Sequence, residues 1–253
     1  MASPNLAAPL VIPFTYLTDD ADVLIVDDDG AEDFESYYTA ALDSLGLSYA
    51  VWDMAVGKLP DDVLQAYRLL IWQVGESYPT LDAEDRDFLE QHLGAGGSLF
   101  LTGQDVGWDL NDSSSGNTDP AFYQSYLHAT YVRDDTNILY LNGVAGDPIT
   151  DGLTLHIAGG DGANNQTYPS EISPRDGNVT ILSYQGDGGG GIRATDAASG
   201  ARIVYLAFGF EAIDNAQDRA DLLGSALAWL GVNELVIDGF ESGDTSAWST
   251  TVP

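Results

Sequence analysis

The chain has 253 residues, and its 40 Asp and Glu residues against 8 Lys and Arg residues give a formal charge of −32. The absence of cysteine excludes a disulfide framework, a cysteine-ligated metal site and a cysteine nucleophile. The shortage of basic residues argues against nucleic-acid binding, which relies on Lys and Arg contacts to phosphates. A hydrophobic content of 44% predicts a folded globular chain.

The composition along the chain predicts three segments. Residues 1–18 contain three prolines and no periodic pattern, which indicates an N-terminal arm or linker. Residues 19–233 contain the regular apolar segments and form the predicted domain, and residues 234–253 form a C-terminal tail. No apolar run approaches the roughly 20 residues of a membrane span. The first residues lack the basic start and apolar centre of a signal peptide.

The first half of the domain alternates between short apolar strands and amphipathic helices. Helices are predicted from Phe34 to Leu45 and from a cap at Thr80 or Asp82 to Leu93. The predicted strands cover residues 23–26, 49–52, 69–74 and 98–102. This alternation predicts an α/β fold of the flavodoxin-like, doubly wound type, with a mainly parallel sheet and helices on both faces.

The second half of the domain is less regular. Residues 151–174 are rich in Gly, Asn and Asp and are expected to form a long ordered loop. The glycine cluster at 186–191 predicts a hairpin turn. Further strands are expected at residues 138–141, 181–184, 191–193 and 201–208, and helices at residues 120–127 and 214–230.

Acidic side chains follow two of the predicted strands. Sites in parallel sheets form beyond the carboxyl ends of the strands. Asp27 and Asp29 follow the first strand, where pleating points both side chains the same way, and Asp105 follows the fourth. Hard cations prefer carboxylate ligands, so these three residues are the predicted metal ligands, for Ca²⁺ or Mg²⁺. No other cofactor is expected.

The same acids are the candidates for catalysis. The run Asp27-Asp28-Asp29-Gly30 resembles the opening motif of haloacid-dehalogenase-type phosphotransferases, in which the first Asp is the nucleophile and the Asp two residues later the acid. Thr102 fits the second motif of that family. The family then needs a lysine after this position, whereas the only lysine, Lys58, lies upstream. A turn whose acids cap the following helix is the structural alternative.

Asp105 is the central residue of a second candidate motif, the segment 103–107 (Gly-Gln-Asp-Val-Gly). A Gly-x-nucleophile-x-Gly elbow presents its central side chain at a strand-to-helix turn. A carboxylate nucleophile there needs a histidine base, and the chain offers His92, His128 and His156. Each of these histidines fits a structural or surface position, so an Asp105 that caps the next helix is the competing interpretation.

Four segments together resemble the class I glutamine-amidotransferase-like superfamily, and in particular its ThuA-like branch. They are residues 96–102 (Gly-Gly-Ser-Leu-Phe-Leu-Thr), 103–107, 146–153 and 201–210. In enzymes of this superfamily the sharp turn holds a cysteine nucleophile, and in the ThuA-like branch the late strand runs into Gly-His. Here Asp105 takes the cysteine position, and Gly209 is followed by Phe210 and Glu211. The resemblance therefore implies the fold without amidotransferase chemistry, and Gln104, Asp105 and Glu211 are the residues expected to contact a ligand.

Residues 238–249 (Asp-Gly-Phe-Glu-Ser-Gly-Asp-Thr-Ser-Ala-Trp-Ser) resemble a terminal motif of secreted bacterial proteins, often peptidases or surface proteins. The expectation is thus a vestigial, non-catalytic accessory or interaction domain of a larger extracellular protein, with a protein or glycan as its partner. The alternatives are a hydrolase or Mg²⁺-dependent phosphatase that uses Asp27 and Asp29 or Asp105, and a carbohydrate-binding module. The aromatic candidates for a sugar site are Trp52, Trp72, Trp108, Tyr123, Tyr126 and Tyr131.

Overall fold

The computed structural model describes residues 23–60, 66–186 and 188–232, so the predicted arm and tail lie outside the described residues. The strands are β1 (Val23–Asp27), β2 (Tyr49–Asp53), β3 (Leu69–Gln73), β4 (Ser98–Thr102), β5 (Ala129–Arg133), β6 (Tyr140–Gly143), β7 (Thr154–His156), β8 (Glu171–Pro174), β9 (Val179–Tyr184), β10 (Gly189–Thr195) and β11 (Arg202–Leu206). The helices are α1 (Glu35–Leu45), α3 (Ala83–Gly94), α4 (Val106–Asn111), α5 (Pro120–Ser125) and α6 (Ala216–Leu230), with a short 3₁₀ turn η1 (Phe210–Ala212).

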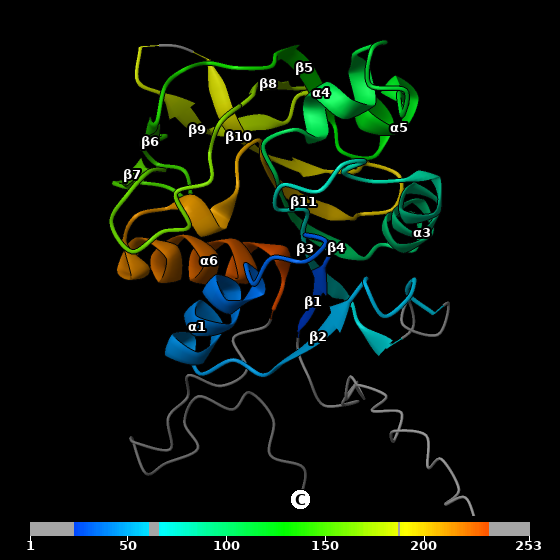
Figure 1. Ribbon diagram of the computed structural model, residues 1–253, viewed down its shortest axis with the longest axis horizontal. Helices are drawn as coiled ribbons and strands as arrows, with labels where there is room; N and C mark the ends of the chain where they lie inside the picture. Colours follow the sequence, from blue (N-terminus) through cyan, green and yellow to red (C-terminus); the bar gives the residue numbers. More distant parts are fainter. Residues whose placement is uncertain (1–22, 61–65, 187, 233–253) are drawn as a thin grey trace, which may run out of the picture.

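All the strands belong to one mixed sheet of 11 strands (Figure 1). Its first part has the order β2-β1-β3-β4-β11 and is parallel throughout, as the strand and helix alternation predicts. From β10 onward every pairing is antiparallel. The prediction of an α/β fold is confirmed, but a mainly parallel sheet describes only half of the molecule. Parallel neighbours need a crossover of a dozen or more residues, whereas β9, β10 and β11 follow one another through short connections that favour antiparallel pairing.

The expectation of one long loop over residues 151–174 is wrong, because this segment contains β7 and β8. Each of these strands has three or four residues and a single fully buried apolar side chain, Leu155 in β7 and Ile172 in β8. So short a segment shows no period-2 pattern. Their extended form depends on pairing with other strands, of β7 with β6 and of β8 with β5 and β10.

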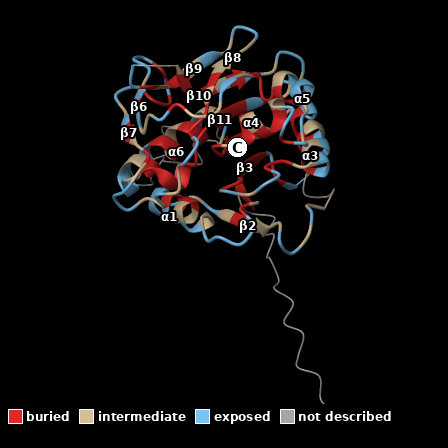
Figure 2. Cartoon of the chain, turned by 45° about the horizontal axis from the view of Figure 1, so that its top comes forward, coloured by how far each residue is buried: buried red, intermediate tan, exposed pale blue. Residues whose placement is uncertain are grey.

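Helices cover both faces of the parallel part of the sheet, as predicted. In β1 the side chains of Val23 and Ile25 pack in one core with α1 and α6, which lie side by side in Figure 1. The alternate side chains, Leu24 and Val26, pack in a second core with α3 and α5. Figure 2 shows the strands buried at the centre of the molecule, with exposed residues on the outer helix faces. Among the described residues, no helix is long and apolar enough to cross a membrane.

The helices begin and end where the sequence places caps. Asp82 accepts hydrogen bonds from two backbone N–H groups at the start of α3, in a capping box with Asp85. Asn215 caps α6 in the same manner. Gly46 and Gly231 end α1 and α6 with φ angles of 69° and 96°, values that favour glycine.

Gly103, directly after β4, is predicted to be indispensable for the packing of the sheet edge. A Cβ atom at this position would lie 2.1 Å from Val74 Cγ2, whereas a Cβ atom at Gly94, at the end of α3, would meet no atom within 4 Å. Gly103→Ala should lower the free energy of unfolding by about 2–4 kcal/mol. Gly94→Ala should raise it by up to about 1 kcal/mol. Urea unfolding of both variants checks this, and equal effects would contradict the packing argument.

Candidate functional site

A row of polar residues closes the carboxyl ends of the parallel strands. Asp27, Gln73 and Thr102 are the last residues of β1, β3 and β4. The strand register pairs Asp27 with Gln73 and Gln73 with Thr102. The three polar side chains therefore come from directly adjacent positions, although the residues before them in each strand are mostly apolar and buried. This edge is where open α/β sheets place their sites.

Gln73 joins two of the predicted carboxylates. Its Nε2 donates to Asp27 Oδ1 at 2.6 Å and to Asp29 Oδ2 at 3.0 Å. Glu35, the first residue of α1, adds a third carboxylate, and one oxygen from each acid lies within 4.8 Å of the others. We call Asp27, Asp29, Glu35 and Gln73 the β1 cluster.

The charges of the β1 cluster are not balanced by a basic side chain. None of the ion pairs between described residues reaches its three acids. Burial holds the pKa of Asp27 well above its usual range, and the neighbouring carboxylates of Asp29 and Glu35 raise it further. Burial likewise raises the pKa of Glu35. The cluster is thus an acidic site that favours either protonation or a cation.

Two atoms of the β1 cluster are buried without a hydrogen-bond partner. They are Gln73 Oε1 and Glu35 Oε2. The side chain of Gln73 is fully buried, at 0% exposure. A buried carbonyl oxygen that accepts no hydrogen bond costs about 1–3 kcal/mol, so native proteins seldom leave one in this state without a reason.

Glu211, one of the predicted ligand contacts, is completely buried beside this cluster. Tyr38 donates to Glu211 Oε2 at 3.0 Å, and Asn165 Nδ2 donates to Oε1 at 2.8 Å. The Tyr38 hydroxyl also lies 2.5 Å from Thr102 Oγ1. Burial raises the pKa of Glu211, and the charge of Asp29 adds to this shift. Both oxygens of Glu211 are therefore engaged in internal hydrogen bonds.

Gln104, another predicted ligand contact, is also engaged internally. Its Oε1 accepts hydrogen bonds from the backbone N–H groups of Thr167 and Tyr168 at 2.8 and 2.9 Å. Its backbone carbonyl accepts the hydroxyl of Ser170 at 2.7 Å. The residue is buried and anchors the segment before β8 to the turn after β4.

Asp105 lies in a different acidic group from Asp27 and Asp29. Burial raises the pKa of Asp105 to about 7, and the carboxylates of Asp134, Asp109 and Glu76 contribute to the shift. Asp105 is the N-terminal cap residue of α4 by position, yet its side chain makes no capping hydrogen bond. Its φ of −102° lies in a region open to any residue, in contrast to the strained backbone of a nucleophile elbow. The structure thus brings together two of the three predicted metal ligands and places the third elsewhere.

The three histidines have partners other than Asp105. His92 is buried and its Nε2 lies 3.1 Å from the carbonyl oxygen of Ser98. His156 pairs with Asp214 at 2.9 Å and stacks on Tyr140. His128 lies between Asp176 and Asp196, at 3.4 and 3.5 Å. No histidine is therefore positioned to act as a base for Asp105.

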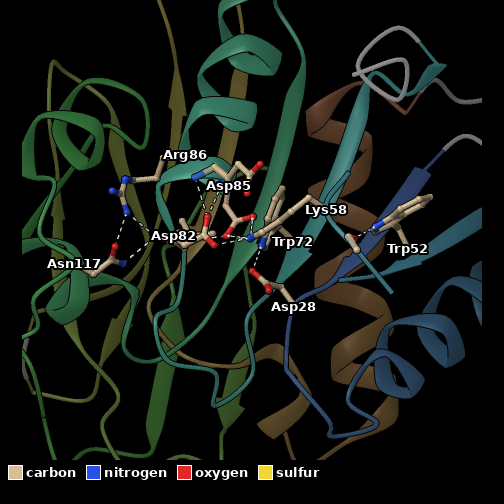
Figure 3. Close-up of polar contacts among 11 residues, drawn as sticks. Asp28, Trp52, Lys58, Trp72, Asp82, Asp85, Arg86 and Asn117 are labelled. Atoms are coloured by element: carbon tan, nitrogen blue, oxygen red, sulfur yellow. Dashed lines mark hydrogen bonds and ion pairs between the residues drawn. The ribbon is translucent and has the colours of Figure 1, made fainter. Parts of the chain in front are cut away.

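The only lysine is paired with acids outside the β1 cluster. Lys58 Nζ lies 2.7 Å from Asp82 Oδ2 and 2.8 Å from Asp85 Oδ1, and Figure 3 shows it beside both. Asp28, between the two cluster residues in sequence, instead accepts a hydrogen bond from Trp72 Nε1 at 3.0 Å (Figure 3). The alternation along the chain therefore separates Asp28 from Asp27 and Asp29.

Two members of the β1 cluster, Glu35 and Gln73, were not among the predicted site residues. Gln73 follows the apolar run of β3 in the same way as Asp27 follows that of β1, and this common position is the signal that would have identified it. Glu35 carried a weaker signal, an acid in the first turn of the helix that follows Asp29.

The comparisons with known proteins show a shared fold. No protein-family model and no curated protein sequence matches the chain. The chain is similar to Gan42B, a GH42 β-galactosidase from G. stearothermophilus, with 12% identity and a TM-score of 0.55 over 83% of its residues. The mmIFT52 N-terminal domain has 12% identity and a TM-score of 0.53 over 85%. The exo-β-1,4-mannosidase Op5Man5 from Opitutaceae bacterium strain TAV5 has 14% identity and a TM-score of 0.54 over 84%.

The similar structures differ in how much of them the chain covers. The chain spans 30% of the β-galactosidase chain and 36% of the mannosidase chain, but 100% of the mmIFT52 domain. The structural neighbours also include a glutamine amidotransferase from Thermotoga maritima, with a TM-score of 0.49, and a putative ThuA-like protein from Parabacteroides merdae, with a TM-score of 0.44.

Because the pKa of Asp105 is raised, replacing this residue should change the free energy of unfolding by an amount that depends on pH. The folded-state pKa is about 7 and the ordinary value 3.8, so the charge opposes folding increasingly as pH rises from about 4 to 7. Asp105→Asn should raise the free energy of unfolding by about 1–3 kcal/mol at pH 8 and change it little at pH 4.

Urea unfolding at pH 4, 6 and 8 measures this effect. Asp112→Asn is the matched control, because hydrogen bonds from Ser114 lower the pKa of Asp112 and its replacement should bring no gain at pH 8. An Asp105→Asn variant with the same stability change at every pH would show that the carboxylate does not titrate as described.

Proposed function

We propose that this chain is a non-catalytic domain of the amidotransferase-like superfamily that serves as an accessory or interaction module of a larger, secreted bacterial protein. A peptidase is the parent protein that the tail motif favours. The observation that carries the non-catalytic assignment is the position of Asp105. It stands where the superfamily has its nucleophile, yet its charged neighbours are acids and no histidine contacts it.

The arrangement of the parallel strands supports the superfamily part of this proposal. The order β2-β1-β3-β4-β11 corresponds to the flavodoxin-like order 2-1-3-4-5. Phe210 follows Gly209 where the ThuA-like branch tends to have histidine, and the next residue, Glu211, is held by Tyr38 and Asn165 in the interior. A side chain in that state supports the packing of the edge and is unsuited to proton transfer with a substrate.

The accessory role rests on the size of the unit and on its charge. Two of the similar structures contain a unit of this fold within a chain about three times as long. A surface with a formal charge of −32 stays hydrated and repels other acidic chains, which suits a module that remains soluble beside a partner.

The phosphatase alternative receives little support from the geometry. A phosphate ester at Asp27 would face Asp29 and Glu35 without a basic side chain to balance its charge. Lys58, the only lysine, is held by Asp82 and Asp85. Repulsion between the phosphate and three carboxylates would oppose binding unless a cation were present.

A carbohydrate-binding role is the second candidate function. A cavity of about 500 Å³ lies at the opposite end of the sheet from the β1 cluster, and Tyr126, Asp196 and Ser199 are among its lining residues. An aromatic ring beside a carboxylate and a hydroxyl is a suitable surface for a sugar. Binding on a glycan array that is lost in Tyr126→Ala would support this role, and an array without binding would remove it.

A panel of ester, amide, phosphate-ester and glycoside substrates tests the non-catalytic proposal. The wild-type chain and Asp105→Ala should both show only the background rate of hydrolysis, because Asp105 lacks a base. Circular dichroism confirms that the variant is folded. Turnover by the wild type that falls at least 100-fold in a folded Asp105→Ala variant would overturn the proposal.

A further inference from the structure

The β1 cluster combines three carboxylates with a buried amide whose oxygen has no partner. The amide of Gln73 donates through Nε2 to Asp27 and Asp29, and the Oε1 of the same amide is buried without a hydrogen bond. We propose that Asp27, Asp29, Glu35 and Gln73 form a Ca²⁺ site that ties β1, β3 and α1 together at the carboxyl edge of the sheet.

The spacing of the carboxylates fits this ion. Ca²⁺ binds oxygen at about 2.3–2.6 Å, so two ligands on opposite sides of the ion are about 4.6–5.2 Å apart. One oxygen from each of the three acids lies within 4.8 Å of the others, which is close enough for small side-chain movements to bring all three to one Ca²⁺. Mg²⁺ needs a smaller, nearly ideal octahedron, with opposite ligands about 4.0–4.2 Å apart.

Gln73 distinguishes this cluster from a chance group of surface acids. A half-turn of its amide exchanges Nε2 and Oε1, two positions of nearly identical shape. With Nε2 inward, the amide donates to the two aspartates, as in the structure. With Oε1 inward, the same side chain supplies a neutral oxygen ligand to the ion, and Nε2 moves to the buried position where Oε1 now has no partner.

The β1 cluster also contacts the start of helix α1. Asp29 Oδ2 accepts the backbone N–H of Phe34 at 3.1 Å, and Glu35 opens the helix. An ion held by Asp27 at the end of β1 and by Glu35 in α1 would fix the intervening turn to the sheet. Ca²⁺ should therefore stabilise the folded chain, since the unfolded chain has no such assembled ligand set.

Isothermal titration of the chelator-treated full chain with CaCl₂, in about 0.15 M salt to screen surface acids, tests the proposal. We expect one site with a Kd of about 10⁻⁵–10⁻³ M, and weaker binding of MgCl₂. At 100 times the Kd, Ca²⁺ should raise the Tm by about 5–10 °C.

Three variants locate the site. Asp29→Asn and Glu35→Gln each remove one ligand charge, and each should weaken Ca²⁺ binding at least 10-fold. Asp28→Asn is the matched control, because it removes a charge from the same acidic triplet while its side chain contacts Trp72 outside the cluster. Its Kd should stay within about 2-fold of the wild-type value.

Gln73→Met tests the amide itself, with circular dichroism as the control for folding. It should also weaken Ca²⁺ binding at least 10-fold. The proposal is overturned if the wild type neither releases heat nor gains in Tm with CaCl₂. It is equally overturned if folded Asp29→Asn and Glu35→Gln bind as tightly as Asp28→Asn, or if MgCl₂ binds as tightly as CaCl₂.

Discussion

The rest of this structure depends on one constraint. Polar side chains are buried in register at the ends of neighbouring parallel strands. Asp27, Gln73 and Thr102 stand at adjacent positions of β1, β3 and β4, where each would be costly to bury alone. Gln73 satisfies two carboxylates at once, and Tyr38 links Thr102 to Glu211. Two sets of polar contacts therefore line the sheet edge, between two apolar cores that hold the strands in place.

The segment that leads into β8, in the antiparallel half of the sheet, also contacts this edge. The segment before β8 returns to the turn after β4, where Gln104 binds Thr167 and Tyr168. Asn165 from the same segment binds Glu211. Gln104 is thus engaged by backbone N–H groups, and Glu211 by the side chains of Tyr38 and Asn165. At this edge the β1 cluster keeps two buried oxygens, Gln73 Oε1 and Glu35 Oε2, without a hydrogen-bond partner.

The sequence predicts the parallel half of the fold well because its signals are local. The apolar run of β1, the cap at Asp82 and the terminating Gly231 are each visible within a few residues. The strands β7 and β8 are not predictable in this way, since their conformation comes from pairing with other strands. In the candidate site, too, some features follow from local sequence and others depend on distant parts of the chain. The common direction of Asp27 and Asp29 follows from pleating, whereas the contact with Gln73 and the separation from Asp105 depend on strand order and register.

The presence of an ion at the β1 cluster is tested most directly by anomalous X-ray scattering from crystals grown with Tb³⁺ in place of Ca²⁺. The account predicts one strong peak among the carboxylates of Asp27, Asp29 and Glu35, with Gln73 Oε1 turned inward to about 2.3–2.6 Å from the ion. Peaks confined to exposed surface acids, with Gln73 Nε2 still donating to Asp27 and Asp29, would contradict it.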